Sequence, residues 1–265
     1  MLVATVNVNG VRAAFRRGMG AWLEMRHPDI LLLQETRAGE EHLRDHLDAD
    51  RWHLAHAEAS AKGRAGVAVA SRLPLAAVRV GLGPDGVATN SGRWVEADVE
   101  LPGGGVLTVV STYVHSGTVG MPSLTDKLAF LDLVTARLRE LGAGGGRAVV
   151  GGDLNTTHRD EDLKNWKGNV GAAGCLPEER AYLDGWFDEL GWVDVHRRLH
   201  GPGPGPYTWW SWRGKAFDND AGWRIDYQLA SPGFAAAAAS AQVDRAASYA
   251  ERWSDHAPVV VRYDV

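Results

Sequence analysis

The sequence predicts an α/β fold that is richer in antiparallel strands than a plain doubly wound sheet. Short apolar, β-branched runs alternate with helical stretches, which is typical of the α/β class. Between residues 52 and 113, five strand-like segments follow one another with only short turns between them. Because strands joined by short turns pair antiparallel, we expect mixed sheets with many hairpins.

Each strand of this fold is predicted from a short apolar run, most often bounded by glycine, proline or another turn residue. The run at residues 30–33 is apolar throughout, which indicates a strand buried on both faces. The expected strands are residues 2–8, 30–33, 52–57, 66–71, 75–80, 93–101, 106–113, 148–150, 225–230, 242–246 and 258–263.

The helices are predicted from apolar stripes and from their terminal residues. Residues 124–141 carry one stripe at helical spacing, with Ser123 as the expected N-cap. Pro177 suits the first turn of a second helix that runs through Leu190. The alternating glycines and prolines at 201–206 exclude both helix and sheet, so this segment is expected to be a loop.

The whole chain is expected to form one domain, residues 1–265, large enough for a sizeable core. A net charge of −5 argues against a protein that coats nucleic acid by bulk charge, but it leaves room for a local basic groove. No apolar run reaches membrane-spanning length and no signal peptide is recognisable, so no membrane contact is expected. Cys175 is the only cysteine, which fits a reducing cytoplasm.

Polar residues follow the central predicted strand at Gly151–Asn155. The two glycines allow a tight exit from the strand, and Asp153 and Asn155 then stand two residues apart, on one face of an extended chain. A carboxylate beside a carboxamide there could bind a hard metal ion or orient a water molecule. Because Gly-Asp turns are common, this segment alone is weak evidence.

Similar polar residues recur at the ends of other predicted strands. Each has a plain alternative: Asn7 as a turn residue, Tyr113 as a strand aromatic, His256 as a core histidine, and Asp226 as the partner of Arg224. Their recurrence favours a common site, and their oxygen ligands suit Mg²⁺ or Mn²⁺ better than zinc. The full set is Asn7, Glu35, Tyr113, Asp153, Asn155, Asp226, Asp255 and His256.

Two literal motif matches do not indicate sites. Gly81–Gly86 fits a dinucleotide-binding pattern, but no helix follows it, so we expect a turn. His42 and His46 have zinc-ligand spacing, yet the glutamate of the metalloprotease pattern is missing and the segment is polar, which favours a surface helix.

Six segments together resemble one family, the exonuclease III type of abasic-site endonuclease within the endonuclease/exonuclease/phosphatase superfamily. They occur in the family's order from residue 7 to residue 258, so the resemblance covers nearly the whole chain. It implies a four-layer α/β/β/α sandwich of the DNase I type, with two mainly antiparallel mixed sheets and the site where their loops meet. The segments are Asn7–Ala13, Leu33–Thr36, Gly151–Asn155, Leu176–Arg180, Gly222–Tyr227 and Ser254–Pro258.

The resemblance also implies roles for the strand-end residues. Glu35 would hold the divalent ion, helped by Asn7 and Asp255. Asp153, steered by Asn155, would orient or deprotonate the attacking water. Asp226 would orient His256, which would donate to a phosphoryl oxygen that Tyr113 also reaches.

A tryptophan-rich stretch between residues 209 and 223 contains Arg213 and Lys215, and Arg224 follows it directly. It could be a core corner, or a surface that stacks on and grips nucleic acid. By resemblance, Trp209, Trp223 and Ile225 match the walls of a pocket for a flipped-out abasic sugar.

One position departs from the family pattern. Where many relatives carry an asparagine that contacts the scissile phosphate, this chain has Ser116, which has a shorter reach.

These observations predict a DNA repair nuclease that depends on Mg²⁺, with Mn²⁺ as a possible substitute. It would act as a monomer on double-stranded DNA with abasic sites or 3′ ends, in the bacterial cytoplasm and at the nucleoid. It would incise abasic sites, degrade 3′ ends as an exodeoxyribonuclease, and remove 3′-phosphates. The alternatives are a phosphatase or phosphodiesterase of the same fold acting on a different phosphoester, and a non-catalytic DNA-binding relative.

Overall fold

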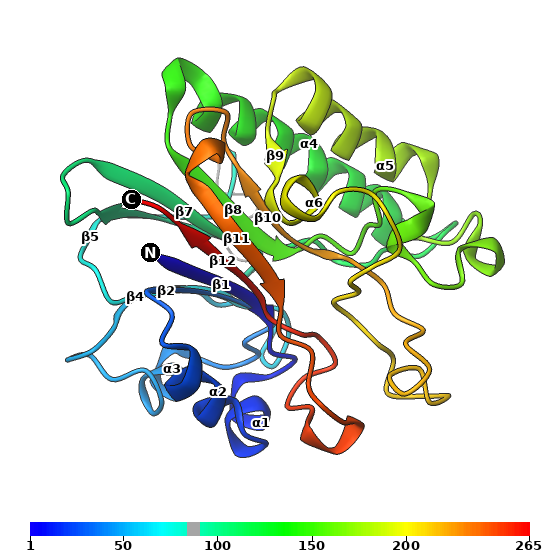
Figure 1. Cartoon of the computed structure of the whole chain (residues 1–265), viewed down its shortest axis with the longest axis horizontal. Helices are drawn as coiled ribbons and strands as arrows, with labels where there is room; N and C mark the ends of the chain where they lie inside the picture. Colours follow the sequence, from blue (N-terminus) through cyan, green and yellow to red (C-terminus); the bar gives the residue numbers. More distant parts are fainter. Residues whose placement is uncertain (84–90) are drawn as a thin grey trace.

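Two six-stranded sheets form the centre of the molecule in a computed structural model that describes residues 1–83 and 91–265 (Figure 1). The predicted turn at Gly81–Gly86 lies partly outside the described residues. The first sheet has the order β11 (Ala238–Val243), β12 (Val259–Tyr263), β1 (Leu2–Asn7), β2 (Ile30–Gln34), β4 (Val67–Ser71) and β3 (His53–Ala57). The second has the order β5 (Leu75–Val80), β6 (Trp94–Glu100), β7 (Val106–Tyr113), β8 (Ala148–Asp153), β10 (Asp226–Ala230) and β9 (Val193–Asp194).

Both sheets are mixed, with one parallel pair each. β1 pairs parallel to β2 and β7 pairs parallel to β8, whereas their other neighbours run antiparallel. The fold class predicted from the sequence is therefore confirmed. The consecutive strands β3–β4, β5–β6, β6–β7, β9–β10 and β11–β12 pair antiparallel, whereas longer connections that contain helices precede β2 and β8.

The sheets stack face to face, and helices cover both outer faces. An apolar core between the sheets includes Val3 and Leu32 of the first sheet and Val109 and Val149 of the second. A second core lies under α4 (Pro122–Gly142) and α5 (Pro177–Asp184), and a third under α1 (Val11–Arg16), α2 (Met19–Arg26) and α3 (Glu40–Arg44). Figure 1 shows the blue helices α1–α3 below the first sheet and α4 and α5 above the second.

Two sequence predictions about element ends were wrong, and a third agrees with the structure. The helix expected from Pro177 through Leu190 is α5, which continues without a break into a π-helical turn, Gly185–Glu189, with Leu190 as its C-cap. α4 begins at Pro122 with Met121 as its N-cap, so Ser123 lies inside the first turn and does not cap it. The strand expected at 242–246 is β11 at Ala238–Val243, and α6 (Val195–His200) packs beside it.

Among the described residues, no helix is long and apolar enough to cross a membrane. The segment 201–206 has no regular secondary structure, as predicted.

Candidate active site

The predicted site residues meet at one end of the two stacked sheets. Parallel neighbours contribute the carboxyl ends of their strands to this edge, and antiparallel neighbours contribute their amino ends. In the second sheet, Asp153 pairs in register with Tyr113 on one side and with Asp226 on the other. Residues from both sheets thus converge on one edge: Asn7, Glu35, Tyr113, Asp153, Asp226 and His256.

Asn7 joins the two sheets. Its side chain is fully buried, and its Nδ2 donates to Glu35 Oε1 at 2.8 Å and to Asp153 Oδ2 at 2.9 Å. Its Oδ1 accepts from the backbone N–H of Asn9 at 2.9 Å. Both protons of the amide are therefore committed to carboxylates, and Asn7 sets the spacing between Glu35 and Asp153.

Asp153 is a buried carboxylate whose hydrogen-bond donors are all neutral. Its Oδ1 accepts from the backbone N–H of Asn155 at 2.9 Å, and its Oδ2 accepts from Asn155 Nδ2 at 3.1 Å as well as from Asn7. Asn155 Nδ2 also donates to Val114 O at 2.8 Å, and the residue adopts a left-handed φ of 46°. Burial raises the pKa of Asp153 to about 7, because it disfavours the charged form more than the nearby His256 favours it. A carboxylate with this pKa can accept a proton near neutral pH.

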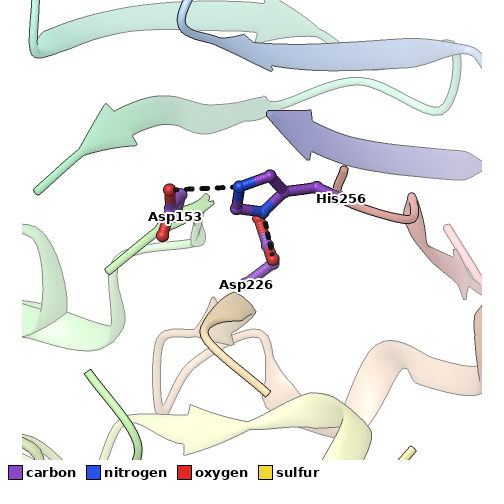
Figure 2. A group of neighbouring side chains, drawn as sticks. All are labelled: Asp153, Asp226 and His256. Carbon is purple, nitrogen blue, oxygen red and sulfur yellow. Dashed lines mark hydrogen bonds and ion pairs between the residues drawn. The ribbon is translucent and has the colours of Figure 1, made fainter. Parts of the chain in front are cut away.

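His256 lies between two aspartates (Figure 2). Its Nδ1 is 2.9 Å from Asp226 Oδ2, and its Nε2 is 3.8 Å from Asp153 Oδ2. Although burial lowers the pKa of His256, Asp226 and Asp153 raise it to about 10. The ring is therefore protonated at neutral pH and can donate from Nε2 toward a bound group. The alternative that Asp226 pairs with Arg224 is wrong, because Arg224 pairs with Asp162 and Asp194.

Glu35 is held at the edge of the cavity by two neighbours. Besides Asn7, the guanidinium of Arg37 contacts Glu35 Oε2, with Nε at 2.9 Å. Glu35 has a left-handed φ of 48°, a strained conformation for a residue with a Cβ, which turns the chain sharply after β2. Burial, followed by the Glu35 carboxylate, raises the pKa of Tyr113, so its phenol remains a donor.

Asp255 is positioned by two side chains from different segments. Asn9 Nδ2 donates to its Oδ1 at 2.8 Å, and Trp209 Nε1 donates to its Oδ2 at 3.2 Å. Burial raises the pKa of Asp255, but His256 and these hydrogen bonds lower it further, so it stays ionised.

A cavity of about 340 Å³ opens over these groups. Trp209 and Trp223 line it and meet edge to face, with ring centroids 6.1 Å apart and planes at 86°. Ile225 and Ser116 line the same cavity, so the predicted apolar wall and the predicted phosphate contact share it.

Two basic residues in or directly after the tryptophan-rich stretch lie away from the cavity. Arg213 is exposed on a loop and does not line the cavity. Arg224 is 1% exposed and bound to two aspartates, so the expectation that it grips nucleic acid is wrong.

The oxygen atoms around the cavity are suitable ligands for a hard divalent cation. Glu35, Asp255 and Asn9 offer carboxylate and amide oxygens, the ligands that Mg²⁺ and Mn²⁺ prefer. Among the described residues, one group of three has ligand atoms within 4.8 Å of one another: Asp153, Asp226 and His256. We assign this group to a hydrogen-bonded network, because His256 Nδ1 is 2.9 Å from Asp226 Oδ2 and both oxygens of Asp153 accept from Asn7 or Asn155.

Comparison with known proteins places the chain in a family. A family model described as Endonuclease/Exonuclease/phosphatase matches residues 4–256, which include every strand-end residue of the site. The chain belongs to this family. The resemblance seen in the sequence is thereby confirmed.

Individual relatives agree with this membership. The chain is 30% identical to an exodeoxyribonuclease of Bacillus subtilis over 261 residues, 98% of each chain. It is 30% identical to a DNA-(apurinic or apyrimidinic site) endonuclease of Dictyostelium discoideum, over 87% of this chain and 62% of that protein. Its structure matches the 3′ phosphatase NExo from Neisseria bound to a product DNA hairpin, at a TM-score of 0.89 and 30% identity over 100% of both chains.

Sequence reasoning missed several residues that shape the site. Asn9 and Glu179 lie in two of the segments that carry the resemblance, Asn7–Ala13 and Leu176–Arg180, but no role was predicted for either. The positions of Arg37 and Lys127 could not be inferred, because Arg37 follows Glu35 through left-handed backbone and Lys127 comes from α4, far from the strand ends.

Proposed function

We propose that the chain is a divalent-metal-dependent DNA repair nuclease that incises 5′ to abasic sites, removes 3′-phosphates and degrades duplex DNA from 3′ ends. The observation that carries this proposal is the Asp226–His256 pair facing Asp153 at the base of a cavity walled by tryptophans. The repair-nuclease class is that of the full-length relatives, which are named exodeoxyribonuclease and 3′ phosphatase.

The side chains have complementary tasks in phosphodiester hydrolysis. Asp153, oriented by Asn7 and Asn155, accepts a proton from the attacking water, whose oxygen forms the new bond to phosphorus. The bond from phosphorus to the 3′ oxygen breaks, and this oxygen takes a proton from solvent water, which leaves a 3′-hydroxyl and a 5′-phosphate. His256 and Tyr113 donate to the phosphoryl oxygens, where negative charge increases in the transition state.

The metal ion would be held by Glu35, with Asp255 and Asn9 near it. When bound, it supplies positive charge that stabilises the developing negative charge on the phosphate and leaving oxygen. Arg37 holds the Glu35 carboxylate in place for this task.

The tryptophan wall favours a small apolar sugar. An abasic sugar leaves the base stack at low cost, because no base pair must be broken. Trp209, Trp223 and Ile225 offer it an apolar surface within the 340 Å³ cavity. Ser116, which is shorter than the asparagine of many relatives, lines the same cavity and is the proposed phosphate contact.

A single set of incision assays tests the proposal against its rivals. Three substrates are compared with Mg²⁺, with Mn²⁺ and with EDTA: a duplex with one abasic site, a duplex with a 3′-phosphate, and p-nitrophenyl phosphate. We expect cleavage of both DNA substrates with either metal, restored after EDTA by added Mg²⁺. Hydrolysis of p-nitrophenyl phosphate alone would indicate a phosphatase on a different phosphoester, and metal-independent DNA binding without cleavage would indicate a non-catalytic relative.

We also propose that the protein acts as a monomer in the bacterial cytoplasm, at the nucleoid. Light scattering during size-exclusion chromatography tests this assembly, and a mass of twice 28.6 kDa would contradict it.

A further inference from the structure

A fully buried ion pair lies directly behind the proposed catalytic residues. Lys127 of α4 and Glu179 of α5 are both 0% exposed, and Lys127 Nζ lies 2.5 Å from Glu179 Oε1. Burial lowers the pKa of Lys127, whereas Glu179 raises it. Buried charges occur in proteins when specific hydrogen bonds satisfy them, so the other partners of this pair indicate its purpose.

Those partners are backbone groups at the edge of the cavity. Lys127 Nζ donates to Asn155 O at 2.9 Å. Glu179 Oε2 accepts from Gly174 N at 2.6 Å and from Leu176 N at 3.1 Å. The pair therefore fastens two segments at once: the turn that carries Asn155, and the loop from Ala172 to Leu176 that leads into α5.

Both segments shape the site. Asn155 holds Asp153 with its side-chain amide and its backbone N–H, from a turn in which its φ is 46°. Gly174, with φ +86°, lies so close to the ring of Trp223 that an added Cβ would be 3.2 Å from it, and its neighbour Ala173 lines the cavity. A shift of either segment would move the water-orienting pair or the tryptophan wall.

Two hydrogen bonds also join the same segments directly, because the backbone N–H and the hydroxyl of Thr157 both donate to Gly174 O, at 2.8 Å and 3.0 Å. They leave Asn155 O and Gly174 N to the ion pair. Among the described residues, Lys127 is the side chain that donates to Asn155 O, and Glu179 is the side chain that accepts from Gly174 N.

We propose that Lys127 and Glu179 are positioning residues, whose buried ion pair fixes the Asn155 turn and the Gly174 loop relative to each other. The pair thereby keeps the Asp153 carboxylate and the tryptophan wall of the cavity at a fixed distance from each other. This inference rests on the proposed nuclease function for its catalytic consequence, although the fixing of the two segments can be measured separately.

The test compares wild type with Lys127→Met, Glu179→Gln and the double variant. For each, the melting temperature, kcat and KM for abasic incision, and hydrogen exchange of the Asn155 and Thr157 amides are measured. Each single variant leaves one buried charge without its partner, so both should melt at lower temperature. In Lys127→Met, kcat should fall about tenfold or more with KM changed less than about twofold, because a small displacement of a reacting group is costly.

The double variant separates positioning from stability. It removes both buried charges, so its melting temperature should recover relative to the single variants. Its kcat should stay as low as that of Lys127→Met, and its Asn155 and Thr157 amides should exchange as fast, because Asn155 O still lacks a donor. Recovery of kcat together with melting temperature would overturn the proposal, as would unchanged amide exchange in all variants.

Glu96→Gln is the matched control. Glu96 is a 2% exposed carboxylate paired with Arg79 and Arg137, and it does not line the cavity. This variant should have a lower melting temperature, while kcat and the rate of amide hydrogen exchange at Asn155 stay as in wild type. A fall in kcat here of the same size would show that any loss of buried charge has this effect, and would overturn the assignment. If wild type itself fails to cleave DNA, the proposed function fails, and the exchange data alone decide the positioning claim.

Discussion

Two buried aspartates of this molecule differ in their surroundings and in the direction of their pKa shift. Asp162, 1% exposed, accepts from Arg224 Nε at 2.7 Å, from Arg197 NH2 at 2.5 Å and from two backbone N–H groups. Asp153, also 1% exposed, accepts only from neutral amides.

Their pKa values differ accordingly. Burial raises the pKa of both carboxyl groups, but Arg224 and Arg197 more than offset this for Asp162, whose pKa falls to about 2. The pKa of Asp153 is raised to about 7. Asp226 lies beside Asp153 and His256, and its buried Oδ1 has no hydrogen-bond partner among the described residues. The fully paired charges around Asp162 stabilise the fold, whereas Asp153 lines the cavity without a positively charged hydrogen-bond donor and is available to the attacking water.

The difference between the two aspartates predicts that removing a carboxylate beside the cavity lowers DNA cleavage more than any other change. Glu35→Ala should lower DNA cleavage by about a thousandfold or more at 1–10 mM Mg²⁺, because the metal supplies several kcal/mol of transition-state stabilisation. The melting temperature should change little, since Glu35 retains some exposure. A Mg²⁺ titration of turnover checks this, and unchanged turnover at low Mg²⁺ would remove Glu35 from the metal site.

A double-mutant cycle tests whether Asp226 and His256 act as one unit. Asp226→Asn should leave the ring in place but without the carboxylate that keeps it protonated, so each single variant should lose about 10²-fold or more in kcat. The double variant should lose little more than the worse single variant. Losses that multiply would mean that the two residues act independently, despite the 2.9 Å contact.

Trp223→Ala sharpens the assignment of the cavity wall. Abasic incision should fall about tenfold, because the sugar loses apolar contact, while release of a 3′-phosphate should fall much less. Both activities must be measured on the same duplex at the same salt and Mg²⁺, because salt alone shifts DNA affinity steeply. Equal losses would assign Trp223 to the fold or to general DNA binding.

The smallest effect concerns stability at low pH. Asp162 has a folded pKa below its unfolded value of 3.8, so its contribution is present above pH 4 and is lost as pH falls toward 2. The contribution is about 2 kcal/mol by linkage. Urea unfolding of wild type and Asp162→Asn from pH 5 to 2 should show the two curves approaching each other, and parallel curves would contradict the ion pairing.

The sequence predicted the strands and the strand-end residues because both depend on local pattern. Apolar runs define β1 and β2 in the first sheet and β8 in the second. A polar residue follows each run, and its place at the end of a strand follows from the local sequence alone. The bridge from Asn7 to both Glu35 and Asp153 could not be predicted, since it depends on how the two sheets pack.

Errors arose where a side chain's environment is set by distant segments. Arg224 stands among tryptophans in the sequence, but Asp162 and Asp194 reach it from elsewhere and neutralise it. Lys127 stands at helical spacing within the apolar stripe of α4, but its partner Glu179 is 52 residues away and does not follow from the local pattern. Ser123 does not cap α4, because Pro122 takes the first helical position and places the N-cap at Met121.

The central claim is that Asp153 acts in catalysis, whereas Asp162 stabilises the fold. Its most direct test compares Asp153→Asn with Asp162→Asn and measures the free energy of unfolding and single-turnover abasic incision on the same samples. Asp153→Asn should lose about a thousandfold or more in rate while remaining at least as stable as wild type, because it removes a poorly compensated buried charge. Asp162→Asn should lose about 3 kcal/mol of stability, because the buried Arg224 keeps only Asp194 as a charged partner, while the folded molecules incise at nearly the wild-type rate. An Asp153→Asn protein that still incises abasic DNA rapidly would contradict the account.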